Sequence, residues 1–289
     1  SKFGIKKALS EINGDFSIIW IPKNENHFFI ARDPFGQRPL YYSKIKDGWV
    51  VSSQPSGIYS LPNFKRNINK NYLFRYGSMH YRMIDNYPDE SPYENIFQLE
   101  ANYYIKFSFE KILEKEKYLE FDFNFENNLS GNDLIEYYKF LLLDATRIRL
   151  NRFSDSEVAF TLSGGMDSSS VLACAVNIRN KPQICYSSLY SDPTYDERDD
   201  IKNILDGYVS EWRKIVLTDS VDLISKIKEI IEIHNEPIAT ATWLSHYELM
   251  QAVKKDNIKV LFGGLGGDEL NAGEYEYFPF HFADLKFKN

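Results

Sequence analysis

Residues 158–170 read VAFTLSGGMDSSS, and this short apolar run with its glycine- and serine-rich turn decides the fold. The run at 158–162 is typical of a buried strand, and the turn is followed by a helical stretch. Outward from it, apolar strands alternate with helices. The predicted strands span 158–162, 184–190, 213–217 and 258–262, and the predicted helices lie near 133–150, 168–179, 196–206, 219–233 and 244–255. Such alternation predicts a parallel sheet covered by helices on both faces.

The turn at 163–169 has the composition of a phosphate-binding loop. Gly164 and Gly165 lack a Cβ, so the backbone can turn tightly and bring its N–H groups against an anion. The positive end of the following helix points at the same place. Asp167 would repel phosphate unless a hard cation such as Mg²⁺ lies between them. The hydroxyl donors are those of Ser163, Ser168 and Ser169. The simpler alternative is a serine-capped helix after a glycine turn.

A second glycine-rich loop follows the strand predicted at 258–262. Residues 263–270 read GGLGGDEL, which places four glycines and two acids behind that strand. Because the carboxyl ends of parallel strands share one edge, we expect both loops to face one crevice. Asp167 and Asp268 could then hold one Mg²⁺ between them. Taken alone, the second loop would more simply be a flexible segment with solvated acids.

The first ~125 residues predict antiparallel strands. Aromatic or β-branched runs lie at 16–21, 28–31, 40–45, 49–52, 102–109 and 118–125. Links as short as these allow only antiparallel pairing of neighbours, so the spacing predicts a meander. Residues 127–132, NNLSGN, are the expected linker, which divides the chain into domains at 1–127 and 128–289.

The composition limits the function classes. The chain has 289 residues and a net charge of −7, with 34 basic and 41 acidic side chains. This balance argues against a nucleic acid or an anionic membrane as the partner, and no apolar run of about 18 residues predicts a membrane span. Cys174 and Cys185 are too few for a disulfide scaffold and lack metal-ligand spacing, which favours a cytoplasmic setting. A chain that begins with Ser1 suggests a processed or incomplete protein.

Three motifs carry a resemblance to a known family. SGGMDSS at 163–169 resembles the pyrophosphate loop (PP-loop) of the ATP-pyrophosphatases. With YDER at 195–198 and GGLGGDEL at 263–270, it is similar to the synthetase domain of the glutamine-dependent asparagine synthetases. RDPFGQRPLYY at 32–42 resembles a turn of their class II glutaminase domain. The resemblance implies an α/β protein: a partial, antiparallel glutaminase-like domain of the Ntn type, then a doubly wound PP-loop domain like those of the adenine nucleotide α-hydrolases.

The resemblance also implies an ATP-dependent, amide-forming ligase. A carboxylate on a small molecule or peptide would attack the α-phosphorus of ATP, and ammonia or an amine would convert the acyl-adenylate to an amide. Ser163, Asp167 and Asp268 would be catalytic, with Mg²⁺ on the two aspartates. The nucleotide-binding residues would be Leu162, Ser163, Gly164, Gly165, Asp167, Ser168, Ser169, Leu189, Gly263 and Gly264. A homodimer or a partner subunit is compatible with this assignment.

Three departures from the family pattern bear on the substrates. The family's glutaminase nucleophile is an amino-terminal Cys, but none of the 31 residues before Arg32 is Cys. This chain as given is therefore not expected to hydrolyse glutamine. Leu265 stands where asparagine synthetases carry Glu, which argues against aspartate as the substrate. The family continues well beyond the second loop, so with its end at Asn289 this chain is expected either to lack a carboxy-terminal part or to be degenerate.

Several residues have more than one interpretation. Glu236 precedes a proline and is expected either to contact the acceptor substrate or to lie at a helix end. Asp196 and Glu197 are expected to begin a helix, where acids complement the dipole, with a catalytic role as the alternative. Arg32 and Asp33 are expected to pin a turn.

Two further functions stay open besides the amidating ligase. One is an intramolecular amide-forming synthetase, similar to the β-lactam synthetases and lasso-peptide cyclases. The other is a nucleotide-binding subunit without turnover. The aromatic stripe at 275–282 is expected to pack on the absent carboxy-terminal part or to line an acceptor pocket.

Overall fold

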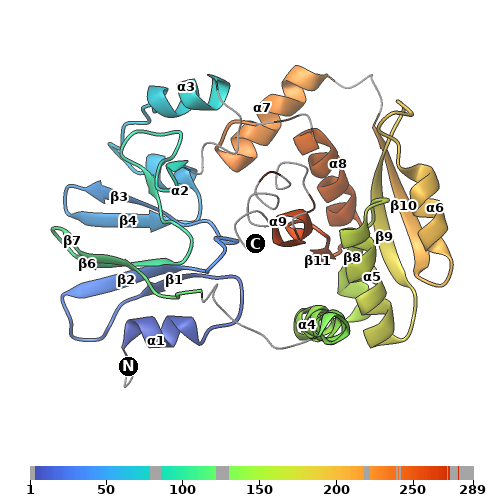
Figure 1. Cartoon of the computed structure of the whole chain (residues 1–289). Coiled ribbons are helices and arrows are strands. Elements are labelled where there is room, and N and C mark those ends of the chain that lie inside the picture. Colours follow the sequence, from blue (N-terminus) through green and yellow to red (C-terminus); the bar gives the residue numbers. More distant parts are fainter. Residues whose placement is uncertain are drawn as a thin grey trace. The chain divides into compact units, whose positions relative to one another are not determined.

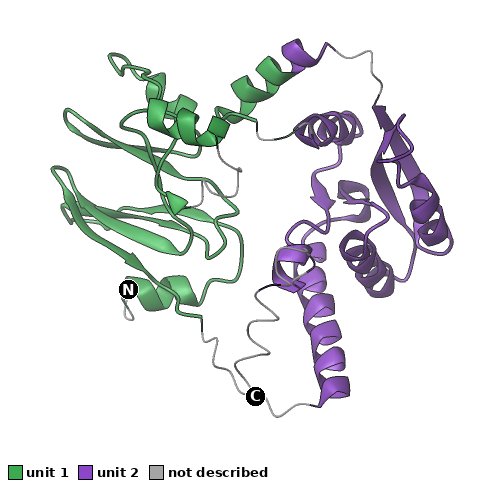
Figure 2. Ribbon diagram, turned by 45° about the horizontal axis from the view of Figure 1, so that its top comes forward, with its two compact units in different colours: residues 1–126, 227–240 green, residues 127–226, 241–289 purple. Residues whose placement is uncertain are grey.

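The computed structural model divides into two compact units (Figures 1 and 2). Unit 1 comprises residues 1–126 and 227–240, and unit 2 comprises residues 127–226 and 241–289. The residues that the structure describes are 4–78, 86–121, 130–217, 222–238, 240, 242–271, 273 and 279. The segment 227–240 thus belongs to the amino-terminal unit, although it lies inside the α/β half of the sequence.

Unit 1 contains two antiparallel sheets. The first has the order β1-β2-β6-β7, with β1 at Ser17–Trp20, β2 at His27–Arg32, β6 at Tyr103–Ser108 and β7 at Ile112–Lys117. The second has the order β4-β3-β5, with β3 at Tyr41–Ile45, β4 at Gly48–Ser52 and β5 at Phe97–Gln98. Ile30 and Ile105 of the first sheet share a buried cluster with Tyr42 of the second, so the sheets pack on each other.

The predicted meander was wrong. β2 and β3 follow each other in the chain but do not pair, because β2 pairs with β6 whereas β3 pairs with β4 and β5. The turn between them carries the chain from one sheet to the other. Asp33 fixes this turn by accepting backbone N–H groups from Phe35, Gln37 and Arg38. The guanidinium of Arg32 donates to the carbonyl oxygens of Gly36, Arg38 and Leu99. Both residues therefore pin the turn, as predicted.

Other parts of unit 1 also differ from the expectation. The last strand is β7, because the chain turns back directly after β6; residues 118–121 are not in a strand, and 122–125 lie outside the described residues. Three short helices were not predicted: α1 (Ile5–Ser10), α2 (Pro55–Tyr59) and α3 (Lys70–Ser78).

Unit 2 contains the predicted parallel sheet. Its strands are β8 (Val158–Thr161), β9 (Gln183–Tyr190), β10 (Val209–Leu217) and β11 (Val260–Phe262), in the order β10-β9-β8-β11. The helices are α4 (Gly131–Leu150), α5 (Met166–Arg179), α6 (Arg198–Leu205), α8 (Thr242–Lys255) and α9 (Gly267–Asn271). A further helix, α7 (Leu223–His234), crosses from unit 2 into unit 1. The α/β fold class with an antiparallel and a parallel part is confirmed.

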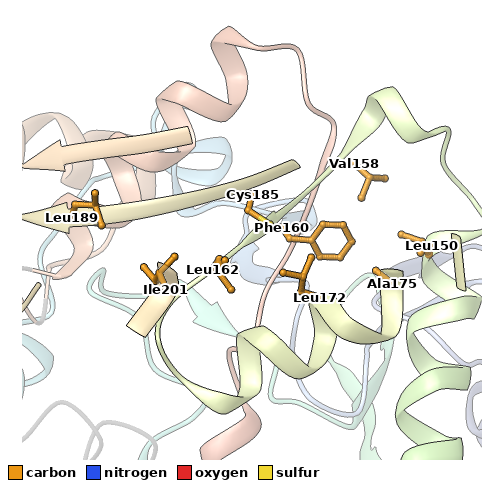
Figure 3. Packing of buried hydrophobic residues seen from close by; sticks show 9 residues of the cluster. All are labelled: Leu150, Val158, Phe160, Leu162, Leu172, Ala175, Cys185, Leu189 and Ile201. Carbon is orange, nitrogen blue, oxygen red and sulfur yellow. The ribbon is translucent and has the colours of Figure 1, made fainter. Parts of the chain in front are cut away.

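Helices cover both faces of the parallel sheet, as the alternating pattern predicted. On one face, Phe160 of β8 and Leu162, just after that strand, pack with Leu172 of α5 and Ile201 of α6 (Figure 3). On the other face, Ala159 of the same strand packs with residues of α8. Alternate residues of β8 thus enter opposite cores, which holds the strand ends in place.

The strand order creates a switch point beside β8. From β8 the chain passes to β9 and β10 on one side, and β11 then lies on the other side of β8. In open α/β sheets, ligands bind outside the carboxyl ends of the strands at such a point. The two glycine-rich loops follow β8 and β11, the two strands that flank it.

The structure describes only part of the expected linker and of the carboxy-terminal region. Ser130 caps α4 through its contact with Asp133, whereas residues 127–129 of the expected linker lie outside the described residues. The aromatic stripe at 275–282 also falls outside them. None of the helices that the structure describes combines the length and the apolar character needed to cross a bilayer.

Candidate functional site

The loops after β8 and β11 lie against each other. A Cβ on Gly264 would be 2.5 Å from the backbone N of Ser168, and a Cβ on Gly267 would be 2.2 Å from Cγ of Asp167. Any side chain at these two positions would collide with the first loop. The glycines therefore permit this close approach, and the two loops lie in contact at one edge of the sheet, as the strand order implies.

The pairing of β8 with β11 sets this approach. Val260 lies beside Val158 and Phe262 beside Phe160 in parallel register. At the carboxyl ends, the Thr161 hydroxyl donates to the carbonyl oxygen of Phe262 over 3.3 Å. The loops consequently leave adjacent strands at the same level.

Serine hydroxyls hold the first loop together. The Ser163 N–H donates to Oγ of Ser168 over 3.1 Å, and the two hydroxyl oxygens lie 2.9 Å apart. Ser168 is 6% exposed, so it is buried beneath the loop. The hydroxyl of Ser169 donates to the carbonyl oxygen of Gly165 over 2.9 Å. Of the three predicted donors, Ser163 is the exposed one, while Ser168 and Ser169 brace the backbone.

The acids of the two loops converge around Asp167. Burial raises the pKa of Asp167, and the negative charges of Asp268 and then Glu269 raise it further. Asp268 and Glu269 lie exposed in the first turn of α9. Within the described part of the chain, no group of three or more His, Cys, Asp or Glu side chains could hold a metal. Two carboxylates are nevertheless a common protein contribution to Mg²⁺, whose other ligands are waters and phosphate oxygens.

Leu162 and Leu189 point into the protein core. Their side chains are 2% and 1% exposed and belong to the cluster of Figure 3. The carbonyl oxygen of Leu162 accepts a 2.5 Å hydrogen bond from Ser187, whose Oγ in turn accepts from Nε1 of Trp212. Only backbone atoms of these leucines are thus available to a nucleotide.

Three predicted site residues lie in the second loop, directly after β11: Gly263, Gly264 and Leu265. A Cβ on Gly263 would lie 2.6 Å from Oγ1 of Thr161, so this glycine also touches the end of β8. Leu265 is 89% exposed, and its side chain has no core to enter.

Glu197 contacts the first loop, although the sequence analysis favoured only a helix start for this residue. Its Oε2 accepts a 3.0 Å hydrogen bond from the backbone N–H of Gly164 in the first loop. Glu197 also begins α6, as predicted, because it is the residue before the first helical position. The sequence signal was the acidic run at 196–200, but its contact with the loop needs the tertiary structure.

Glu236 belongs to unit 1. Its Oε1 accepts a hydrogen bond from the Tyr41 hydroxyl. The neighbouring Asn235 accepts from the N–H of Ser56 through Oδ1, and the Tyr76 hydroxyl donates to the carbonyl oxygen of Pro237. Unit 2 by itself therefore brings together every predicted site residue except Glu236.

Comparison with known families identifies the relationship. A family model described as asparagine synthase matches residues 138–288, more than half of the chain. The chain belongs to the asparagine synthase family. A second model, described as a glutamine amidotransferase domain, matches residues 1–119. The resemblance carried by the three sequence motifs is thereby confirmed.

Relatives in this family are 27–29% identical to the chain over the aligned residues. The asparagine synthetase [glutamine-hydrolyzing] 2 of Bacillus subtilis is 27% identical over 286 residues, covering 92% of this chain and 37% of that protein. The rat enzyme of the same name, without the number, is 27% identical, covering 96% and 48%. A relative of Methanocaldococcus jannaschii, with a provisional asparagine synthetase name, is 29% identical, covering 92% and 50%. The chain spans about half the length, or less, of these relatives.

Solved structures give a weaker likeness. An NH3-dependent NAD synthetase from Campylobacter jejuni is 15% identical with a TM-score of 0.33, covering 47% of this chain and 58% of that one. A glutamine-dependent NAD synthetase from Acinetobacter baumannii, in complex with ADP, has a TM-score of 0.34 at 20% identity, covering 63% and 33%. Overlaps of this size support no argument about the chain.

Proposed function

We propose that this chain is the catalytic part of an ATP-dependent ligase that forms an amide. It activates a carboxylate as an acyl-adenylate, with release of pyrophosphate, and passes the acyl group to ammonia or an amine, with release of AMP. The observation that carries the proposal is the contact of the two glycine-rich loops at the switch point, with Asp167 beside the acids of α9. Membership of the asparagine synthase family supports the same reaction class.

The first loop binds the phosphates of ATP. The loop leads directly into the positive, amino-terminal end of α5, where an anion is stabilised, and Ser163 lies exposed in it. Ser168 and Ser169 hold this loop in shape through their bonds to its backbone. Gly263 and Gly264 border the nucleotide on the opposite side, and the backbone of Leu162 and Leu189 lies toward the adenine.

Asp167 and Asp268 hold Mg²⁺. Burial raises the pKa of Asp167, and the charges of Asp268 and then Glu269 raise it further; a divalent cation between the carboxylates would remove their mutual repulsion. When bound, the cation neutralises the departing pyrophosphate. The chain itself contributes the placement of the two carboxylates. They lie on loops that are packed together, with Gly264 against the backbone of Ser168 and Gly267 against Asp167.

The nitrogen donor and the acceptor are proposed from the family. Several relatives are named glutamine-hydrolysing asparagine synthetases. In the first candidate ammonia supplies the nitrogen, since residues 1–31 of this chain contain no Cys to act as the glutaminase nucleophile. The second candidate is an intramolecular amide-forming synthetase. Leu265 favours it, because this exposed leucine cannot act as a base or bind an amino group.

Pyrophosphate exchange tests the proposal. Purified protein should incorporate labelled pyrophosphate into ATP when a panel of carboxylates and Mg²⁺ is supplied, and Asp167→Asn should abolish the exchange. The matched control is Asp199→Asn, which removes an exposed carboxylate bound to Lys202 outside the loops. If amide formation requires added ammonia, the first candidate is favoured. If the amide forms without ammonia, the second candidate is favoured. Saturable Mg·ATP binding with no exchange under any condition would contradict both and leave a nucleotide-binding subunit.

A further inference from the structure

The N–H of Gly164 is engaged by a carboxylate from outside its own loop. Glu197 accepts this N–H through Oε2 over 3.0 Å. The Gly164 amide belongs to the turn that precedes α5, a helix of 14 residues whose positive end faces the loop. A carboxylate oxygen thus uses a donor of the kind that stabilises phosphate oxygens.

Packing of α6 fixes this contact. A Cβ on Gly164 would lie 2.6 Å from Cβ of Asp200, so the start of α6 touches the loop with no room for a side chain. Ile201, one residue further, is 1% exposed and enters the core beside Leu162. Its N–H donates to the carbonyl oxygen of Glu197 over 3.0 Å. The anchored helix consequently delivers the Glu197 carboxylate to the phosphate loop.

The neighbouring acids have different partners. Asp196 lies 3.5 Å from Nε of Arg198, and Asp199 lies 2.8 Å from Nζ of Lys202. Glu197 instead accepts from a main-chain amide of the loop. Its role is therefore distinct from the ordinary preference for acids in the first turn of a helix.

We propose that Glu197 is an internal competitor of phosphate at this loop. A phosphate that binds the Gly164 N–H must displace the carboxylate, because one N–H cannot serve two acceptors at full strength and two anions in contact repel each other. Glu197 thereby lowers the affinity of the loop for ATP and for pyrophosphate, and it recaptures the amide when pyrophosphate leaves. This inference rests on the proposed function and assigns that site its own regulating residue.

Direct binding measurements test the competition. The dissociation constants of Mg·ATP and of inorganic pyrophosphate with Mg²⁺ are measured by calorimetry on the full chain. Glu197→Gln keeps an acceptor but removes the charge, and Glu197→Ala removes both. Because the carboxylate no longer competes for the Gly164 amide, we expect roughly three- to tenfold tighter pyrophosphate binding, with the Ala variant at least as tight as Gln. Asp199→Asn, which removes a nearby charge without touching the loop, should change it by less than about twofold.

The outcomes separate this inference from the proposed function. If the unaltered protein binds Mg·ATP but both Glu197 variants bind pyrophosphate equally or more weakly, Glu197 supports the loop and the competition is refuted. If neither the unaltered protein nor any variant binds ATP or pyrophosphate, the proposed function fails and this inference fails with it. Thermal unfolding of each variant verifies its fold, and the isosteric Gln variant alone suffices for the decision if the Ala variant does not fold.

Discussion

The hydroxyl of Tyr41 donates a 2.5 Å hydrogen bond to Oε1 of Glu236, although the two residues are 195 positions apart in the sequence. Tyr41 is 5% exposed, and burial followed by the negative charge of Glu236 raises its pKa, so the hydroxyl stays a donor at neutral pH. Together with the contacts of Asn235 and Pro237, this bond joins the segment 227–240 to residues 1–126, the rest of unit 1. Glu236 therefore serves as an anchor at the end of α7.

We expect Tyr41→Phe to destabilise unit 1. The substitution removes the donor and leaves a half-buried carboxylate oxygen unpaired, which costs roughly 1–3 kcal/mol of unfolding free energy. Urea denaturation followed by circular dichroism measures the loss. The control is Tyr137→Phe, since Tyr137 is 50% exposed on α4 and should change stability by less than about 0.5 kcal/mol. Equal stability of both variants would show that the bond anchors nothing.

We expect Asp167→Asn to abolish pyrophosphate exchange while changing the unfolding free energy only slightly. The raised pKa of Asp167 means that its ionised form is disfavoured in the folded state. At pH well below 3.8, the ordinary pKa of an aspartate, the carboxyl is protonated in both states, so the variant and the unaltered protein should be equally stable there. As the pH rises above that value, the unaltered protein loses stability and the Asn variant gains a small advantage, within about 0.5 kcal/mol. Unfolding at several pH values measures this advantage, while pyrophosphate exchange should be lost. A variant that is less stable at pH 7 would contradict the repulsion.

We expect Gly264→Ala to damage the contact between the loops. The added Cβ would lie 2.5 Å from the backbone N of Ser168, and backbone cannot move aside as a flexible side chain can. Overpacking of this kind typically costs about 1–3 kcal/mol, and nucleotide binding should weaken with it. Gly131→Ala is the control because nothing lies within 4 Å of its Cβ position. Thermal unfolding and Mg·ATP titration compare the two, and a silent Gly264→Ala would mean that the loops are further apart.

We expect the ion pair between Glu157 and Lys259, the residues just before β8 and β11, to stabilise the protein less in acid. Hydrogen bonds from Lys259, and then from the N–H and hydroxyl of Ser154, lower the pKa of Glu157 from 4.5 to about 2. A depressed carboxyl pKa contributes stability above the unfolded value, and this contribution disappears as the pH falls from 4.5 toward 2. Glu157→Gln should flatten the pH dependence of unfolding in that interval. Glu232→Gln, an exposed substitution on α7, is the control: here the unfolding free energy should keep the pH dependence of the unaltered protein in that interval.

The sequence indicated unit 2 far better than unit 1 because its signals are local. An apolar run, a glycine turn and a helix stand next to each other at 158–179, so a parallel sheet and its loops follow from neighbouring residues alone. In unit 1 the link from β2 to β3 has the same local appearance as a hairpin connection. Whether it joins paired strands or crosses between sheets depends on the buried guanidinium of Arg32 and on the partners that β6 offers. No periodicity carries that information.

The sequence by itself therefore determined the family, the parallel sheet and the two loops that meet at its edge, because each is written in contiguous residues of fixed spacing. The tertiary structure alone decided which segments close on one another over long separations. It assigned residues 227–240 to the amino-terminal unit through Tyr41 and Glu236, and it brought Glu197 to the N–H of Gly164. Such pairings arise from packing of buried side chains such as Ile201, and packing depends on the whole folded chain.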